Sequence, residues 1–303
     1  MPIVEVINLR KSFGDVAALN GVNLTINRGE AFCLLGPDGA GKTTFLRILA
    51  GVMAANSGEI RILDQDIIKH PDAAKQSIGY LSQRFSLYPD LTVAENIDFY
   101  SRLFKISRQD NQIRKERLLE FSRLGPYVNR RTKHLSGGMK QKLALSCALI
   151  HTPKLLILDE PTTGVDPISR REFWKILYDF LADGLTILFA TPYMDEAERA
   201  SRVALLYDGQ VINCDTPENL KRQFKYHLAE LITDDNRQSR QLLQDKFGRN
   251  NVVFFGDKLH LKLEDYQTAN SQIQQILQEN RVNIVSLEQI APGMEDVFVD
   301  AIA

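Results

Sequence analysis

The feature that most constrains the fold is the run Gly-Pro-Asp-Gly-Ala-Gly-Lys-Thr at residues 36–43. It has the spacing G-x-x-x-x-G-K-[ST], follows an apolar run at residues 31–35 and leads into a helical pattern. A strand, a glycine-rich turn and a helix in this order present backbone N–H groups to phosphate oxygens, with the positive end of the helix dipole behind them. The run therefore predicts a phosphate-binding loop in an α/β domain.

The side chains of this loop indicate how it would hold a nucleotide. Lys42 is placed to reach the β- and γ-phosphates, and the hydroxyl of Thr43 is placed to ligate Mg²⁺. A carboxylate beside polyphosphate is repelled, so we expect Asp38 to point outward or to accept a backbone N–H. The residues predicted to contact the nucleotide are Gly36, Pro37, Asp38, Gly39, Ala40, Gly41, Lys42, Thr43 and Thr44.

Two acidic residues follow a second apolar run, at residues 155–158. In a site built on a phosphate loop, a neighbouring strand supplies such an acidic end. Asp159 is predicted to hold Mg²⁺ through water, and Glu160 to polarise the attacking water. A buried strand can end in two acids by chance, but the loop at residues 36–43 favours a nucleotide-hydrolysing site.

Short apolar runs alternate with amphipathic helical patterns up to about residue 215, which predicts an α/β domain with a largely parallel core sheet. Helical spacing without a convincing strand indicates an inserted helical subdomain at about residues 88–150. The strands are predicted at residues 3–8, 22–26, 31–35, 59–63, 77–81, 154–158, 185–190, 202–207 and 210–214, and the inserted helices at 93–104, 111–123 and 137–150.

Beyond a predicted linker helix at residues 218–225, the order of elements becomes β-α-β-β-α-β, the ferredoxin-like order, with one more amphipathic helix at the end. The ranges are 226–232, 238–247, 251–255, 258–263, 266–279, 282–289 and, for the last helix, 294–302. We therefore predict two domains, residues 1–220 and a small α+β accessory domain at residues 221–303.

Charge and hydropathy restrict the partners. The 37 Lys and Arg residues nearly balance the 38 Asp and Glu residues, so no global field attracts nucleic acid or an anionic membrane. No window approaches the roughly 18 apolar residues needed to span a bilayer, and we expect a cytosolic chain. A basic cluster is interpreted as a solvated face because interleaved aromatic residues are missing. It comprises Arg130, Arg131, Lys133, Lys140 and Lys142.

The cysteines and histidines are interpreted as structural. Each cysteine has apolar neighbours in the sequence, which indicates small core residues in a reducing compartment. The settings of the five histidines suggest loops or the surface. These residues are Cys33, Cys147 and Cys214, and His70, His134, His151, His227 and His260.

The run Leu-Ser-Gly-Gly-Met-Lys-Gln at residues 135–141 resembles the signature of the ATP-binding-cassette (ABC) family almost letter for letter. The resemblance covers roughly residues 4–220 and implies the P-loop NTPase fold of an ABC ATPase. It also implies that Ser136 and the N–H groups of Gly137 and Gly138 cap a helix and bind the γ-phosphate held by another subunit. ATP would then join two subunits.

Further elements of the family follow in order. The resemblance places Phe13 where an aromatic ring stacks on adenine, Gln83 where a glutamine senses Mg²⁺ and water, and Asp166 in a loop that crosses the dimer. The segments 87–96 and 293–298 look like the bacterial multidrug and antibiotic export branch. Membership implies a separate membrane permease, and a position on the inner face of the cell membrane. The aromatic run from Tyr80 to Tyr100, including Phe85, is the groove expected for the permease, although ordinary core packing would explain it too.

One residue departs from the family pattern. Members place a histidine in a Thr-His-x-x-Asp/Glu-Glu-Ala setting, and this chain has Pro192 at the histidine position. Proline cannot donate to the γ-phosphate, and a donor aimed at developing phosphoryl charge is worth roughly 3–4 kcal/mol. We therefore hypothesise that the chain's own site binds ATP and hydrolyses it slowly, while its signature completes a site on a partner that has the histidine.

Three alternatives stay open. The chain could form a homodimer with weak activity, in which Glu160 and Mg²⁺ suffice. It could be a soluble cassette ATPase acting on ribosomes or DNA, although no coiled-coil insertion or tandem cassette is seen. It could also be a regulatory subunit that binds ATP with little hydrolysis.

Overall fold

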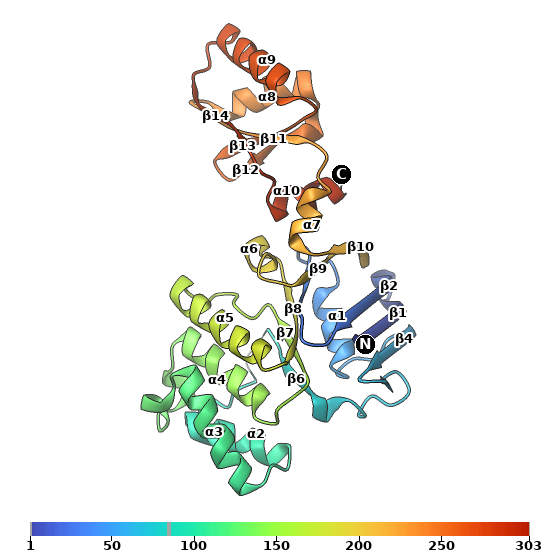
Figure 1. Ribbon diagram of the computed structural model, residues 1–303, viewed down its shortest axis with the longest axis vertical. Coiled ribbons are helices and arrows are strands. Elements are labelled where there is room, and N and C mark those ends of the chain that lie inside the picture. Colours follow the sequence, from blue (N-terminus) through green and yellow to red (C-terminus); the bar gives the residue numbers. More distant parts are fainter. Residues whose placement is uncertain (1, 84–85, 303) are drawn as a thin grey trace. The chain divides into compact units, whose positions relative to one another are not determined.

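The strand before the phosphate loop lies inside a six-stranded sheet of order β10-β9-β3-β8-β7-β6 (Figure 1). The computed structural model describes residues 2–83 and 86–302. All neighbouring strands of this sheet pair in parallel except β9 and β10, as the predicted largely parallel core requires. The bounds are β3 (Ala31–Leu35), β6 (Ile78–Leu81), β7 (Leu155–Asp159), β8 (Thr186–Thr191), β9 (Arg202–Tyr207) and β10 (Gln210–Asp215).

Three of the predicted strands, β1, β2 and β4, form a second, antiparallel sheet together with the short strand β5, which was not predicted, in the order β2-β1-β4-β5. Their bounds are β1 (Pro2–Phe13), β2 (Val16–Asn27), β4 (Ser57–Ile62) and β5 (Gln65–Asp66). Apolar side chains of this sheet, of β3 and of helix α1 (Lys42–Leu49) form one buried cluster, which contains Val4, Phe32 and Phe45. The helix that begins at the phosphate loop is thus packed against both sheets.

Three helices form the predicted insertion, α2 (Val93–Leu103), α3 (Arg108–Ser122) and α4 (Gly137–Leu149), and α4 contacts the other two (Figure 1). Helix α3 begins three residues before the predicted start because Ser107 accepts a hydrogen bond from the backbone N–H of Asp110 (3.1 Å) and caps it. Two further helices, α5 (Pro167–Ala182) and α6 (Met194–Ala197), follow strands β7 and β8.

The chain divides into two compact units, Met1–Pro217 and Glu218–Ala303, and helix α7 (Pro217–Arg222) contains the division. The second unit has the ferredoxin-like element order predicted from the sequence, and its strands pair antiparallel in the order β12-β13-β11-β14. Its elements are β11 (His227–Thr233), α8 (Asn236–Phe247), β12 (Val252–Phe255), β13 (Lys258–Leu263), α9 (Tyr266–Glu279), β14 (Ile284–Ile290) and α10 (Met294–Ile302).

Three expectations about single residues are wrong. His260 is neither in a loop nor on the surface, because it lies in β13 with 3% of its surface exposed, 2.7 Å from Asp296 of α10. Cys214 is only half-buried and lies 3.4 Å from the guanidinium of Arg202. Lys142 is not part of a solvated face, since it is buried and forms an ion pair with Glu172.

Candidate functional site

The phosphate loop has the backbone geometry that its glycines predict. A Cβ on Gly36 would stand 2.3 Å from the carbonyl oxygen of Leu206, and one on Gly41 would stand 2.3 Å from that of Ala18. Gly41 also has a φ of 104° and lies at the N-terminus of α1. Larger residues at these positions would push the loop away from β2 and β9, so the close approach requires glycine.

Lys42 lies within the loop. Its ammonium group donates hydrogen bonds to the carbonyl oxygens of Gly36 (2.8 Å) and Pro37 (2.9 Å), and it lies 3.9 Å from Glu160. Burial lowers the pKa of Lys42, and the nearby carboxylates oppose that shift. The side chain of Asp38 is 92% exposed, and its carboxylate lies 3.9 Å from the Lys42 ammonium.

Strand β7 brings Asp159 to the start of α1. The hydroxyl of Thr43 donates to Oδ1 of Asp159 (3.0 Å), while Oδ2 is buried and has no hydrogen-bond partner within residues 2–83 and 86–302. Burial raises the pKa of Asp159. A hydroxyl and a carboxylate with a free, desolvated oxygen are the ligand types that Mg²⁺ prefers, so the two residues fit a magnesium ion delivered with a nucleotide.

Glu160 is the next residue, and its backbone is strained. Its φ of 48° lies in the left-handed region that residues other than glycine rarely adopt, at a cost of about 1–3 kcal/mol. A hydrogen bond from its N–H to the carbonyl oxygen of Ala190 on β8 (2.9 Å) holds this conformation. Oε2 of Glu160 accepts from the Gln83 amide (3.0 Å) and the Thr163 hydroxyl (3.3 Å). Gln83, Lys42 and Asp159 therefore meet around this carboxylate.

The signature segment forms a separate group of residues. Ser136 caps α4, since its hydroxyl oxygen accepts from the N–H of Met139 (3.3 Å), and Gly137 is exposed beside it. A Cβ on Gly138 would stand 2.4 Å from the hydroxyl of Ser169 on α5, which requires glycine there. Asp166 caps α5 by accepting from the N–H of Ser169 (2.9 Å). Hydrogen bonds from the side chain and the backbone of Ser169 lower the pKa of Asp166.

Phe13 lies at the end of β1 and is 49% exposed, with the Lys11 ammonium 5.2 Å from its ring centre. The ring is thus accessible to a planar ligand. Phe85, in the aromatic run predicted to contact a permease, lies outside the described residues, as does its neighbour Arg84. Among the described residues of that run, the large side chains of Tyr88 and Phe99 are exposed, and their ring centres are 4.5 Å apart.

Pro192 lies directly after β8 and is half-buried. The segment that contains it is held by contacts that sequence analysis did not single out. Glu196 is fully buried and accepts a hydrogen bond from Thr162, two residues after Glu160. Arg170 of α5 lies 3.5 Å from Asp195 of the same segment. The sequence shows the acidic residues of this segment as Asp-Glu-Ala, but the burial of Glu196 could not be inferred from it.

No cluster of three or more metal-ligating His, Cys, Asp or Glu side chains occurs in the described parts of the chain, 2–83 and 86–302. In the same parts, every helix is too short or too polar to cross a bilayer. The polar groups thus form two sets. One set surrounds the phosphate loop, and the other lies at the capped ends of α4 and α5.

Comparison with known proteins confirms the family resemblance that the sequence indicates. Residues 19–163 match the family model described as ABC transporter, and residues 216–302 match the C-terminal domain of ATP-binding proteins similar to DrrA1-3. The Nod factor export ATP-binding protein I of Bradyrhizobium diazoefficiens is 36% identical over 298 residues, which cover 98% of this chain and 95% of that protein. The chain belongs to the ABC transporter family of ATP-binding proteins.

Other members of the family are also similar to this chain. The probable multidrug ABC transporter ATP-binding protein YbhF of Escherichia coli is 37% identical over 98% of this chain, which spans about half (52%) of YbhF. The solved ATP-binding subunit of an ABC transporter superposes with a TM-score of 0.67 at 30% identity, over 73% of this chain and 93% of that structure. An ATP-binding cassette bound to ADP and Pi superposes with a TM-score of 0.65 at 28% identity, over 70% and 98%. This chain is accordingly an ABC-type ATPase.

Proposed function

We propose that this ABC ATPase powers export through a separate membrane permease, and that ATP is held between its phosphate loop and the signature segment of a second ABC domain. The division of the polar groups into two sets carries the proposal. Lys42, Thr43, Asp159 and Glu160 surround one place for a nucleotide, whereas the Ser136 cap opens elsewhere on the surface. Each set supplies half of a nucleotide site.

In this proposal the loop residues 36–44 bind the phosphates and Phe13 stacks on adenine. Thr43 and Asp159 would hold Mg²⁺, directly or through water, and Gln83 would contact the same ion and water. The ion would neutralise charge on the phosphates. Glu160 orients and polarises the attacking water, and the Gln83 amide fixes the direction of that carboxylate. Ser136, Gly137, Gly138 and Asp166 serve the ATP bound by the other subunit.

We further propose that hydrolysis at the chain's own phosphate loop is slow. The carboxylate at residue 160 is in place, but Pro192 brings no donor to the end of β8. A missing donor of this kind costs about 10²–10³ in rate. A chain that binds ATP and hydrolyses it slowly is suited to a pair of ABC domains in which only the partner's site is fast. The absence of a donor at Pro192 also supports the second candidate, a regulatory subunit that binds ATP with little hydrolysis.

The partners follow from this arrangement. A second ABC domain, identical or different, completes the nucleotide sites, and an integral membrane permease carries the cargo. The chain would then lie at the inner face of the cell membrane. One relative is named a multidrug ABC transporter ATP-binding protein and another a Nod factor export ATP-binding protein, and the second name supports export as the direction of transport.

Light scattering on a Glu160→Gln variant tests the shared site. With Mg-ATP, we expect two ABC domains to associate, either as two copies of this chain or with an ABC chain from the same gene neighbourhood that is co-expressed with it. Lys42→Ala, which loses the phosphate contact, should prevent the association. ATP binding without association in either arrangement would contradict the proposal.

A further inference from the structure

A cavity of about 390 Å³ lies in the unit Met1–Pro217 and is separate from the proposed nucleotide site. Its lining includes none of the phosphate-loop or signature residues. Small-molecule sites in proteins have volumes of about 300–1,000 Å³, and this cavity falls within that range. It is therefore large enough for an organic ligand of moderate size.

The cavity lies at the opposite edge of the central sheet from the nucleotide loop. It is lined by Lys154, which precedes β7, and by Thr186, the first residue of β8. The parallel strands β7 and β8 end at Asp159 and Thr191, beside the phosphate loop. Because a strand rises about 3.3 Å per residue, roughly 15 Å of sheet separates the two places. A ligand in the cavity would not compete with ATP for contacts.

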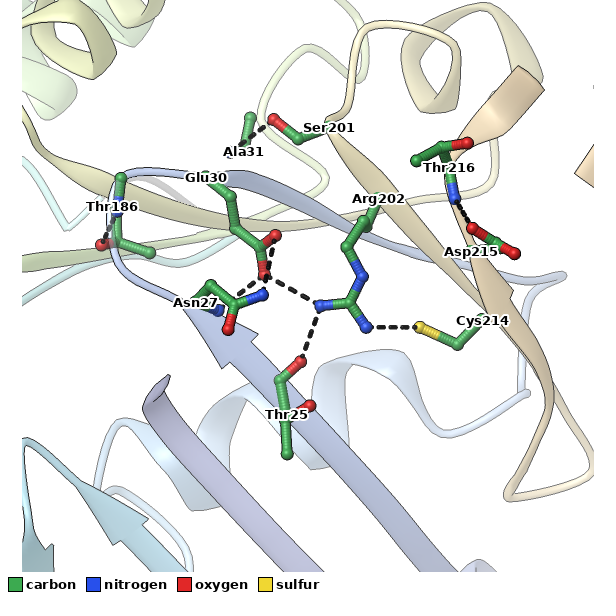
Figure 2. Close-up of polar contacts among 11 residues, drawn as sticks. Thr25, Asn27, Glu30, Ala31, Thr186, Ser201, Arg202, Cys214, Asp215 and Thr216 are labelled. Atoms are coloured by element: carbon green, nitrogen blue, oxygen red, sulfur yellow. Dashed lines mark hydrogen bonds and ion pairs between the residues drawn. The ribbon is translucent and has the colours of Figure 1, made fainter. Parts of the chain in front are cut away.

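A rigid turn carries one of the cations of the lining, Arg28. In this turn the N–H of Asn27 donates to the carboxylate of Glu30 (2.7 Å), and the N–H of Gly29 donates to the hydroxyl of Thr186 (2.9 Å) (Figure 2). The turn between β2 and β3 is thereby attached to the start of β8. Arg28 lies between these two attachments, so the backbone that carries it is fixed.

The basic residues at this edge differ in whether they are already paired. Arg202 donates to Glu30 (3.1 Å) and to the carbonyl oxygen of Thr25 (3.2 Å), as Figure 2 shows. Arg117 of α3 forms an ion pair with Asp183 (2.5 Å). Arg28 and Lys154 are exposed, and neither has a carboxylate partner in the part of the chain that the structure describes. The cavity therefore presents two unpaired positive charges.

The lining also includes apolar side chains, among them Leu149 of α4, Phe180 of α5 and Leu185. We propose that the cavity binds a small amphipathic organic anion. Its carboxylate, sulfonate or phosphate group would lie between Arg28 and Lys154, and its apolar body would lie against these three side chains. The ligand would contact both the inserted helices and the central sheet.

Fluorescence titration of the full chain with 8-anilinonaphthalene-1-sulfonate tests this proposal, with N-phenyl-1-naphthylamine as the uncharged ligand of the same ring system. We expect saturable binding of one sulfonate per chain that Mg-ATP does not displace. The double variant Arg28→Gln/Lys154→Gln should weaken sulfonate binding at least about tenfold and leave the uncharged ligand unaffected. Arg108→Gln/Arg171→Gln, which removes the same charge from exposed arginines outside the lining, should bind like the wild type.

Four results would overturn the proposal. They are absence of saturable sulfonate binding, displacement by ATP, equal weakening in both double variants, and an affinity that Arg28→Gln/Lys154→Gln leaves unchanged. None of these readouts involves ATP hydrolysis or association of two ABC domains. Failure of this proposal is therefore distinguishable from failure of the proposed export function.

Discussion

Strands β7 and β8 are parallel neighbours that end at the same edge of the central sheet, yet their ends differ in chemistry. The end of β7 carries Asp159 and Glu160, which contact Thr43 and Gln83. The end of β8 carries Pro192, which has neither a polar side chain nor an N–H. The same sheet edge can therefore retain the groups for binding ATP and for polarising water while lacking a donor next to them.

Removing the carboxylate at the end of β7 should have the largest effect. In Glu160→Gln we expect ATP hydrolysis to fall by about 10²–10⁴, since a general base contributes that much. ATP affinity should stay near that of the wild type, because Lys42 and Thr43 are untouched. Steady-state phosphate release and equilibrium ATP binding measure the two quantities. Glu264→Gln, an exposed acid in the second unit, is the control, and equal losses in the two variants would refute the role of Glu160.

The two strand ends are joined by a buried hydrogen bond from Thr162, after β7, to Glu196, after β8. Thr162→Val should lower the free energy of unfolding by about 1–3 kcal/mol, because it leaves a buried carboxylate oxygen without its donor. Urea denaturation measures this change. When Glu196 is already replaced by Ala, the further change Thr162→Val should lower the free energy of unfolding by less than it does in the wild type. If the losses of the two single variants simply add in Thr162→Val/Glu196→Ala, the contact does not join the strand ends.

The smallest effect is expected at Arg170, which lies 3.5 Å from Asp195 and 5.3 Å from the centre of the Tyr193 ring. Exposed ion pairs and cation–π contacts contribute about 0.2–1 kcal/mol each. Arg170→Ala should therefore lower the free energy of unfolding by about 1 kcal/mol. The control Arg171→Ala, at the adjacent exposed residue, should change the free energy of unfolding less. Equal stability of Arg170→Ala and the wild type would mean that α5 does not hold the segment of Pro192.

The sequence predicted the elements that surround the loop well, because their signals are local. Apolar runs bounded by turns predicted β3 and β9 with their observed ends, and the alternation of elements predicted a parallel sheet. The assignment of β1, β2 and β4 to a separate sheet was missed, since strand pairing depends on contacts between distant residues.

The burial of charged side chains also could not be predicted from the sequence. Glu196 and Lys142 have ordinary polar neighbours in the sequence, and only tertiary packing buries them. The positions of Lys42 and Thr43 could be predicted because a spaced motif fixes their backbone, and that of Asp159 because an acidic residue directly follows an apolar run. The contacts of His260 with Asp296 and of Thr162 with Glu196 join separate elements, so no local pattern predicts them.

The claim that Pro192 slows ATP hydrolysis at the chain's own phosphate loop is tested most directly by comparing the wild type with Pro192→His and Pro192→Ala. The ATP dissociation constant and the hydrolysis rate are measured side by side. We expect unchanged ATP affinity in all three proteins and a hydrolysis rate that rises by up to about 10²–10³ in Pro192→His alone, since only histidine adds a donor. Rapid hydrolysis by the wild type, with no gain on introducing histidine, would contradict this claim.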